Sequence, residues 1–546
     1  MTSHCVILRN KKHKVWGNLG KEKLFYSSFI MNTEYIIVQA GGKGSRMQYL
    51  TTNKPKSLVP VKNLPMLFHL FRKYPDKKFI IIGDYKYEVM RRYLAAFADV
   101  KYLLVDARGQ AGTCAGISKA LSLIPDEKAF MLIWSDLILP EEFSMPEEEG
   151  DYVGLSGDFR CRWKFENGIF EEEPSVTHGV AGLFIFHDKT VISDVPEQGE
   201  FVRWLRDKEM LPKELVLSRT KEYGLIEEYN KLEKQRCRPF NRMYVEGGKI
   251  RKEGIDEQGR GLAIREKGWY QSMEKLFSEN EVSESLRHAI PKIYSYEPFV
   301  MQRVDGKNLY EYPDLLLEEK KAVLGKAVGV LKELHSLGSA ETDYFSMKEA
   351  YLTKTLSRLS KIRDLIPFAD QKYITVNGRK CRNVYFFLEE FETALNALDA
   401  KNFAVLHGDC TFSNMMLHKD SMPVMIDPRG YFGFTELYGD PAYDWAKLYY
   451  SVVGNYDQFN LKNFRLTIHE EDTAENQVEL SIESNGFEEC EEEFFRLLAG
   501  EVTKEQIKLI HAVIWLSLTT YAWEDYDSIC GAFYNGIYYL EEVMGK

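Results

Sequence analysis

Residues 36–61 read IIVQAGGKGSRMQYLTTNKPKSLVPV and decide the fold of the N-terminal part of this chain. The apolar run at residues 36–38 leads directly into the Gly-Gly-Lys-Gly sequence at residues 41–44, which predicts a buried strand that ends in a loop with little side-chain bulk. Glycines let backbone N–H groups turn toward an anion, and Arg46 and Lys56 add positive charge nearby. A glycine-rich turn alone also fits an ordinary connection between a strand and a helix. Together with the two cations, it predicts a loop that wraps phosphates.

The same stretch resembles the signature of the nucleotidylyltransferase family that couples nucleoside triphosphates to sugar phosphates or phosphocholine. That signature is a glycine-rich loop ending in Arg, followed by Pro-Lys-x-Leu-x-Pro-Val. The resemblance implies that Arg46 and Lys56 are catalytic and stabilise charge on the transferring phosphate. Gln39 departs from the small or apolar residue that is common in the family, so contacts with the base are less predictable. The nucleotide-binding residues that the resemblance implies here are Gly41, Gly42, Gly44, Gly112 and Thr113.

Length and composition limit the possible classes of protein. The chain of 546 residues is long enough for more than one domain, and 45% hydrophobic with 28% charged residues is ordinary for globular proteins. The formal net charge of -11 argues against broad nucleic-acid binding, and eight cysteines without a C-x-x-C pair argue against a disulfide framework or a zinc site. No apolar run reaches the length of a membrane span or a signal-peptide core. We therefore expect a cytoplasmic protein whose partners are small molecules and nucleotides; the sequence predicts no oligomeric state.

Residues 34–236 alternate apolar strands with amphipathic helices. The predicted strands lie at residues 36–38, 79–82, 102–105 and 130–134. This alternation predicts an α/β, Rossmann-like domain with a mostly parallel sheet and helices on both faces. Ligands of such sheets lie beyond the carboxyl ends of the strands, where the glycine-rich loop and Asp136 fall. The basic segment at residues 1–33 is interpreted as an N-terminal extension.

Two carboxylates of this domain are candidates for metal binding. Asp136 follows the strand at residues 130–134, and a lone Asp at such a place is often a turn or helix cap. The family resemblance implies that Asp136 holds the catalytic Mg²⁺. The second metal carboxylate of the family usually opens an Asp-x-Gly run, and the best match is Glu222-Tyr223-Gly224, with Glu where Asp is usual. Glu222 is therefore the predicted second ligand, with Asp158 as the alternative.

Residues 237–546 are expected to form a second domain. Residues 243–252 read as a β-hairpin with a tight Gly-Gly turn, and residues 263–276 read as a helix. Lys252 on the strand and Glu266 on the helix have the arrangement that kinases use to orient the phosphates of a nucleotide. Either residue alone is more often a solvated charge.

Two later segments carry three oxygen-bearing side chains. They read HGDCTFSN at residues 407–414 and VMID at residues 424–427, and they contain Asp409, Asn414 and Asp427. Phosphoryl transfer needs such a set, with one carboxylate that orients the acceptor hydroxyl and an amide and a second carboxylate that hold Mg²⁺. A chance group of capping residues is the alternative.

These two segments resemble the aminoglycoside phosphotransferase and choline kinase family, whose pattern is His-Gly-Asp, four residues, Asn, and then Ile-Asp. The resemblance implies a two-lobed, protein-kinase-like α+β fold. It also implies that Asp409 is the catalytic base, that Asn414 and Asp427 hold Mg²⁺, and that Lys252 and Glu266 face the nucleotide.

Three further features of the second domain lie outside these motifs. His335 is expected to be a packed helix residue rather than a catalyst. Residues 462–485 depart from the simplest family members and read as an inserted hairpin. Trp523 lies in the helical part where such kinases build the acceptor pocket, so it fits either the core or an aromatic cage for a quaternary amine.

Both parts of the chain are therefore expected to be catalytic. A kinase makes a phosphate monoester, and a nucleotidylyltransferase consumes one together with a nucleoside triphosphate. We expect a bifunctional enzyme that uses ATP, a second nucleoside triphosphate such as CTP, and Mg²⁺ in both domains. Its product would be an NDP-sugar or CDP-alcohol precursor of capsule or other cell-surface polysaccharide. The alternatives are a choline kinase/phosphocholine cytidylyltransferase, and an enzyme in which one half only binds nucleotide as a regulatory module.

Overall fold

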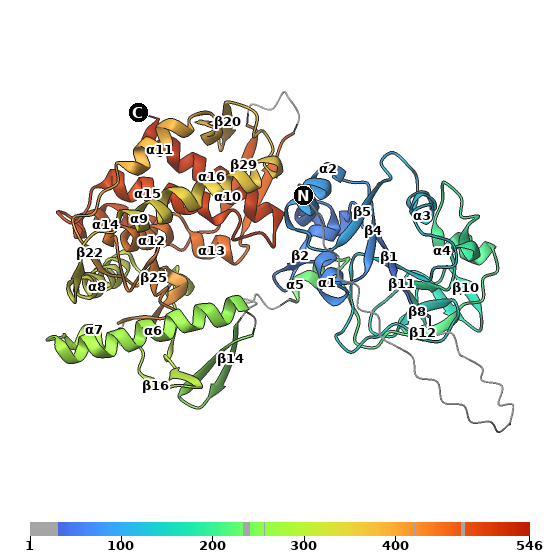
Figure 1. Ribbon diagram of the computed structural model, residues 1–546, viewed down its shortest axis with the longest axis horizontal. Helices are drawn as coiled ribbons and strands as arrows, with labels where there is room; N and C mark the ends of the chain where they lie inside the picture. The colour runs from blue at the N-terminus through green and yellow to red at the C-terminus, as the bar shows by residue number, and fades with distance from the viewer. Residues whose placement is uncertain (1–30, 233–240, 256, 419–421, 471–475, 546) are drawn as a thin grey trace, which may run out of the picture.

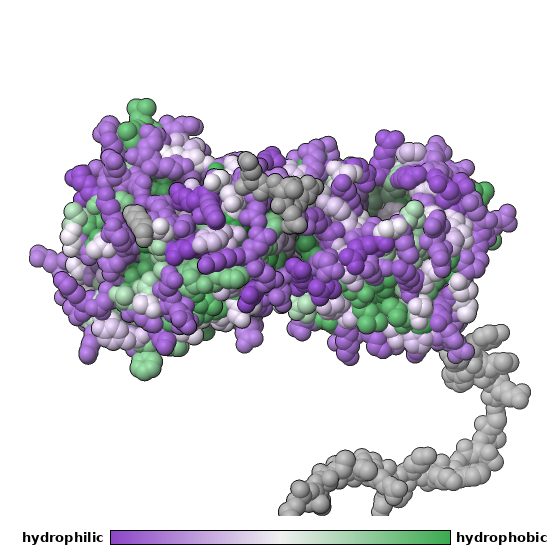
Figure 2. Space-filling view, turned by 90° about the horizontal axis from the view of Figure 1, so that it is seen from above, coloured by the Kyte–Doolittle hydropathy of each residue, from purple (hydrophilic) through white to green (hydrophobic). Residues whose placement is uncertain are grey.

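The computed structural model describes residues 31–232, 241–255, 257–418, 422–470 and 476–545. Figure 1 shows two units side by side: a sheet-centred unit built from the N-terminal part of the chain and a helix-rich unit built from the rest. The predicted boundary between residues 236 and 237 lies outside the described residues. Figure 2 shows mostly hydrophilic residues over both units on the face seen from above. Within the described ranges, every helix is too short or too polar to cross a bilayer.

The N-terminal unit is built on a nine-stranded sheet with the order β10-β9-β11-β6-β1-β4-β5, in which β9 is Lys164–Glu166 and β10 is Ile169–Glu171. In addition, β8 pairs with β11, and β12 pairs with β8. Its centre is parallel: β1 pairs with β4 and β6, and β4 pairs with β5. The bounds of these strands are β1 Tyr35–Gln39, β4 Lys78–Gly83, β5 Lys101–Asp106, β6 Phe130–Trp134, β8 Tyr152–Ser156, β11 Gly179–Phe186 and β12 Lys213–Val216. The predicted strands and the mostly parallel sheet are confirmed.

Helices cover both faces of this sheet because its central strand is apolar on both sides. In β1, Ile36 and Val38 pack with α1 (Met66–Lys73) and α2 (Tyr87–Phe97). Ile37 points to the opposite face and packs with α3 (Cys114–Leu121) and α4 (Phe201–Asp207). Alternate side chains of a strand point to opposite faces, so one unbroken apolar run fills both cores.

The glycine-rich loop begins directly after β1, at the carboxyl edge of the sheet. Gly44 has φ +63°, and a Cβ at this position would lie 2.9 Å from the Cβ of Lys56. The backbone N–H of Lys56 donates to the carbonyl of Gly42 (3.4 Å). Only glycine fits this close approach without strain, so the loop and the segment that carries Lys56 lie against each other.

The C-terminal unit has a small lobe made of a sheet and one long helix. The sheet has the order β14-β15-β17-β16, and the helix is α6 (Glu257–Glu279). β14 (Asn241–Glu246) and β15 (Lys249–Gly254) form the predicted hairpin around Gly247-Gly248. The predicted helix is confirmed and extends beyond residues 263–276 at both ends. The remaining strands are β16 Ile293–Tyr296 and β17 Phe299–Gln302.

The second lobe is mainly helical, with the two-lobed arrangement that the sequence predicts (Figure 1). Its main helices are α8 Leu317–Ser336, α10 Lys354–Ile362, α12 Pro441–Val452, α13 Tyr456–Asn460, α15 Lys504–Leu518 and α16 Tyr526–Met544. The expected inserted hairpin is also present, because β28 (Phe464–Ile468) pairs antiparallel with β29 (Val478–Ile482). This hairpin extends the sheet that contains β20 (Tyr373–Val376).

The two units meet through a buried polar contact that the sequence analysis did not foresee. Lys54 is 1% exposed, and its Nζ lies 3.0 Å from Asp525 Oδ1 and also pairs with Asp527. Asn53 donates to the carbonyl of Leu466 in β28 (2.8 Å) and accepts from the backbone N–H of Ile468 (3.2 Å). The segment just before Lys56 is therefore fixed by the C-terminal unit.

Trp523 packs against the hydrophobic core, as one of the two expected roles has it, and its partners there belong to this same interface. Its ring lies 5.7 Å from the ring of Phe68 in α1 and 5.9 Å from that of Phe97 in α2, centroid to centroid. Its carbonyl accepts a hydrogen bond from the hydroxyl of Tyr93. The proposed aromatic cage around Trp523 is thus wrong, because the ring packs on the N-terminal unit.

Candidate active sites

In the N-terminal unit, the structure brings Lys56 and Asp136 together although 80 residues separate them. Lys56 opens the short helix η2 (Lys56–Leu58), and Asp136 follows β6. The Lys56 ammonium forms an ion pair with Asp136, whose residue is 6% exposed. Burial opposes ionisation of Asp136, but Lys56 outweighs it and lowers the pKa of this carboxyl below its usual range. Arg46, in η1 (Ser45–Thr51), stays exposed at the same edge.

Glu222 lies beside Asp136. It ends β13 (Lys221–Glu222), which pairs antiparallel with β7 (Leu137–Ile138), the strand that follows Asp136. A Cβ on Gly224 would lie 2.0 Å from Glu222 Oε1 and 3.1 Å from Asp136 Oδ2, so glycine makes room for both carboxylates. Burial and the neighbouring Asp136 raise the pKa of Glu222 to about 7. The alternative, Asp158, is exposed, and its backbone N–H donates to Ser156 Oγ (3.1 Å).

The pair formed by Asp136 and Glu222 fits a divalent cation. Two adjacent carboxylates repel each other, and a bound cation would relieve that repulsion. Mg²⁺ is usually held by one or two protein carboxylates, with phosphates and water completing its coordination. Within the described part of the chain, no group of three or more His, Cys, Asp and Glu residues could hold a metal by itself.

The segment Gly112-Thr113 is held close to the end of β1. Gly112 has φ +84°, and a Cβ there would lie 2.2 Å from the carbonyl oxygen of Gly199. Gln39 Nε2 donates to the carbonyl of Thr113 (2.7 Å), and Thr113 Oγ1 accepts from the backbone N–H of Phe201 (2.8 Å). Gln39, the departure from the family pattern, therefore fixes the segment that the resemblance assigns to the base.

In the C-terminal unit, Lys252, Glu266 and Asp427 form one cluster. Lys252 Nζ lies 2.7 Å from Glu266 Oε2 and 2.7 Å from Asp427 Oδ1. Burial opposes the charge of Lys252, but Asp427 and Glu266 outweigh it and raise its pKa. Burial raises the pKa of Glu266 to about 7. The fold thus brings Asp427 to the Lys252–Glu266 pair, although 175 residues separate Asp427 from Lys252.

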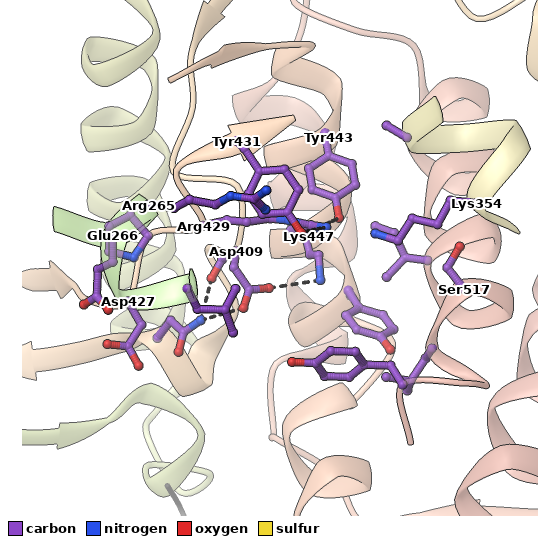
Figure 3. A pocket seen from close by; sticks show the side chains of 18 of the residues that line it. Arg265, Glu266, Lys354, Asp409, Asp427, Arg429, Tyr431, Tyr443, Lys447 and Ser517 are labelled. Carbon is purple, nitrogen blue, oxygen red and sulfur yellow. Dashed lines mark hydrogen bonds and ion pairs between the residues drawn. The ribbon is translucent and has the colours of Figure 1, made fainter. Parts of the chain in front are cut away.

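Asp409 lies between this cluster and the helical lobe (Figure 3). Asn414 Nδ2 donates to Asp409 Oδ2 (2.9 Å), and Lys447 Nζ lies 3.0 Å from Asp409 Oδ1. The amide carbonyl of Asn414 and the carboxylate of Asp427 are oxygen ligands of the kind Mg²⁺ prefers, so these two residues fit the ion.

Asp444 holds the loop that carries Asp409. It accepts from the backbone N–H groups of His407 (2.9 Å) and Gly408 (2.7 Å). His335 Nε2 lies 3.1 Å from Asp444 Oδ2 and its ring packs edge-on against Trp445, at 4.9 Å between centroids. The structure therefore places His335 behind the loop, as a packed residue.

A cavity of about 540 Å³ opens between the two lobes and includes Lys252, Asp409 and Asp427. Its far wall holds basic residues that the sequence analysis missed: Lys354, Arg358, Arg429 and Lys447. Two weak signals were present in the sequence. Lys354 and Arg358 are four residues apart and so share one helix face, and Arg429 comes two residues after Asp427. Neither signal shows that the residues meet, because they come from different elements.

Comparisons with known proteins agree with this division of the chain. Residues 36–144 match the MobA-like NTP transferase domain, and residues 274–468 match the phosphotransferase enzyme family. UTP–glucose-1-phosphate uridylyltransferase AglF of Haloferax volcanii is 32% identical over 168 residues, which are 30% of this chain and 65% of that protein. Bifunctional protein GlmU of Methanocaldococcus jannaschii is 31% identical over 111 residues, 19% of this chain and 26% of that protein. The chain thus spans less than two thirds of either relative.

Solved structures similar to part of this chain include HddC from Yersinia pseudotuberculosis, with 18% identity and a TM-score of 0.31 over 37% of this chain and 98% of that one. CTP:phosphocholine cytidylyltransferase from Streptococcus pneumoniae has the same identity, TM-score and coverage. The two family matches fall in the two units described above. The chain therefore carries a nucleotidyltransferase domain followed by a phosphotransferase domain.

Proposed function

We propose that the protein is a bifunctional enzyme. Its phosphotransferase domain, residues 237–546, transfers the terminal phosphoryl group of ATP to a hydroxyl of a small molecule. Its nucleotidyltransferase domain, residues 34–236, then joins the resulting phosphate to a nucleotidyl group from a second nucleoside triphosphate. The observation that supports this proposal is that each domain has its own cluster of a lysine and two carboxylates: Lys56 with Asp136 and Glu222 in the first, and Lys252 with Glu266 and Asp427 in the second.

In the first step, Asp409 accepts the proton of the acceptor hydroxyl. The hydroxyl oxygen bonds to the γ-phosphorus of ATP, and the bond between that phosphorus and the β–γ bridging oxygen breaks, so ADP leaves. Lys252, held by Glu266, faces the phosphates. Asn414 and Asp427 would hold Mg²⁺, which when bound neutralises charge on the phosphates. Lys447 keeps Asp409 in place through their ion pair.

In the second step, a phosphate oxygen of the phosphorylated compound bonds to the α-phosphorus of the nucleoside triphosphate, and pyrophosphate leaves. Lys56 and Arg46 stabilise the charge that develops on the transferred phosphate. Asp136 and Glu222 would hold the Mg²⁺ of this site. The glycine-rich loop supplies backbone N–H groups to the triphosphate.

The product would be a nucleoside-diphosphate derivative, made in the cytoplasm, that serves as a precursor of cell-surface polysaccharide. A sugar phosphate as intermediate is supported by the names of curated relatives, which include a glucose-1-phosphate uridylyltransferase and a glucose-1-phosphate cytidylyltransferase. The latter, from Salmonella typhimurium, also supports CTP as the second nucleoside triphosphate.

Separating the two activities by mutation tests this proposal. Asp409→Asn should abolish phosphorylation by ATP and leave nucleotidyl transfer to a supplied sugar phosphate intact, while Lys56→Ala should do the reverse. Release of ADP and of pyrophosphate reports the two steps independently. If either single change removes both activities from a folded protein, the two sites are not separate. If one activity is missing from the unmodified protein with every acceptor and nucleotide, that domain is a binding module.

A further inference from the structure

The kinase cavity is electrically asymmetric. Figure 3 shows Glu266 and Asp427 on one side of Asp409, and Lys354 and Ser517 on the other. The basic residues of the far side come from three places: α10 supplies Lys354 and Arg358, the segment after Asp427 supplies Arg429, and α12 supplies Lys447. In the described part of the chain, Lys354, Arg358 and Arg429 form no ion pair with a carboxylate, whereas Lys447 pairs with Asp409.

Neutral groups of the protein hold two of these cations in position. Arg429 donates to the hydroxyls of Tyr443 (2.7 Å) and Tyr431 (3.0 Å). Arg358 donates to the backbone carbonyl of Ser517 in α15. Hydroxyl and carbonyl oxygens orient a guanidinium but do not neutralise it. The carboxylates nearest this wall are Asp409, which pairs with Lys447, and Glu349, so the three other cations lack a direct ionic partner among the described residues.

Lys354 shows the cost of this arrangement in the empty cavity. Burial, together with Arg429, Arg358 and Lys447, lowers the pKa of Lys354 to about 6, and Glu349 offsets this only in part. Partly buried cations without counter-charge are unfavourable for folding, so a cluster of them suggests a ligand that supplies the charge.

We infer that the compound phosphorylated by this domain carries an anionic group of its own, a carboxylate or a phosphate, which Lys354, Arg358 and Arg429 bind while its hydroxyl faces Asp409. This inference rests on the proposed kinase function. Guanidinium groups bind both carboxylates and phosphates through paired N–H donors. The geometry therefore specifies an anionic group and does not distinguish a carboxylate from a phosphate. The phosphorylated product would then bear two anionic groups when it reaches the nucleotidyltransferase domain.

The aromatic side chains of the cavity do not favour a quaternary amine such as choline. Lys447 Nζ already lies 5.5 Å from the ring centroid of Tyr450 and 5.9 Å from that of Tyr456. Arg265 and Arg429 lie 4.1 and 4.5 Å from the ring of Tyr431. A cationic headgroup would compete with the protein's own cations for these rings, and those cations would repel it.

Matched acceptors test the inference in the full-length protein with ATP. The pairs are glycerate and glycerol, and glucuronate and glucose; glucose 6-phosphate adds a phosphate as the anion, and choline adds a cation. We expect kcat/KM for the anionic member to exceed that of its neutral partner by about tenfold or more, the effect of one charge-assisted contact. Glucuronate and glucose 6-phosphate together show whether a carboxylate or a phosphate is preferred.

A neutral or cationic acceptor with the higher kcat/KM would overturn the inference and leave the kinase proposal standing. If the unmodified protein phosphorylates none of the acceptors, both the inference and the kinase proposal are refuted. Arg358→Gln should raise KM for the best anionic acceptor by about tenfold, and by a clearly larger factor than it raises KM for the neutral partner.

Lys354→Met provides a second variant. It removes a partly buried amine with no ionic partner among the described residues, so thermal stability should stay the same or increase while KM for the anionic acceptor rises. A lysine with only a structural role would instead lower thermal stability when replaced and leave this KM unchanged. Lys348→Met is the matched control, because Lys348 is exposed and lies outside the cavity lining. Equal KM values for Lys354→Met and Lys348→Met would contradict the inference.

Discussion

Replacing Lys54 with methionine should weaken the contact between the two domains and, through it, nucleotidyl transfer. The ammonium of Lys54 is buried between Asp525 and Asp527, which begin α16. Lys54 and Lys462 lower the pKa of Asp525 to about 2 although burial opposes this, whereas burial raises the pKa of Asp527. Asp525 is thus paired with both Lys54 and Lys462, whereas the ion pair of Asp527 is with Lys54.

The expected loss follows from this geometry. Removing one partner of a buried ion pair costs about 3–5 kcal/mol because the other charge stays buried without compensation. Lys462 Nζ, 3.9 Å from Asp525 Oδ2, retains part of that compensation, so we expect a value near the lower end of this range. Because Lys54 comes two residues before Lys56, a displaced segment should also lower kcat for nucleotidyl transfer by about tenfold or more.

Urea-induced unfolding followed by tryptophan fluorescence measures the first effect, and pyrophosphate release measures the second. Lys62→Met is a suitable control, because Lys62 is exposed on the same segment. Lys54→Met combined with Asp527→Asn should be less destabilised than the sum of the single changes, since the pair is removed as a unit. A loss below about 1 kcal/mol, the scale of a solvated surface pair, would refute the reasoning.

Three further predictions concern the two sites. Lys56→Ala should lower kcat for nucleotidyl transfer by about 10²-fold, and Lys56→Met should be equally impaired because the charge is what matters; a raised KM with normal kcat would contradict this. Gly224→Ala should raise the Mg²⁺ concentration needed for half-maximal nucleotidyl transfer, because its Cβ would displace Glu222, and an unchanged Mg²⁺ titration would count against that site. Binding of an anionic acceptor should tighten as pH falls from 8 toward 6, because Lys354 gains its charge there; calorimetry in buffers of different ionisation enthalpy should show proton uptake, and none with Lys354→Met.

Sequence patterns predicted those residues whose positions follow from a local rule. Parallel strands end at one edge of a sheet, so Lys56 and Asp136 could be expected to meet there. A hairpin followed by a helix brings Lys252 next to Glu266 in the same way. Glu222 departed from the usual Asp, and its fit depends on Gly224, whose missing side chain leaves room for the longer arm.

The basic wall and the domain interface could not be predicted in this way. Arg358 and Arg429 line the same cavity although α10 and the segment that follows Asp427 are far apart in the sequence, and no periodicity encodes that placement. A tryptophan suits a domain core, an aromatic cage and a domain interface equally well. The residue type of Trp523 therefore could not reveal that its partners belong to the other domain.

The position of Lys54 finally bears on whether the two domains are exchangeable modules. Pro55, with φ -68° and ψ 155°, leaves little freedom in the backbone that joins Lys54 to Lys56. Separating the domains would strip Lys54 of both its carboxylates and expose the rings of Phe68 and Phe97. A nucleotidyltransferase domain from another protein could replace the first domain only if it carried a lysine at the position of Lys54, facing the start of α16. Each domain therefore contributes residues that stabilise the other.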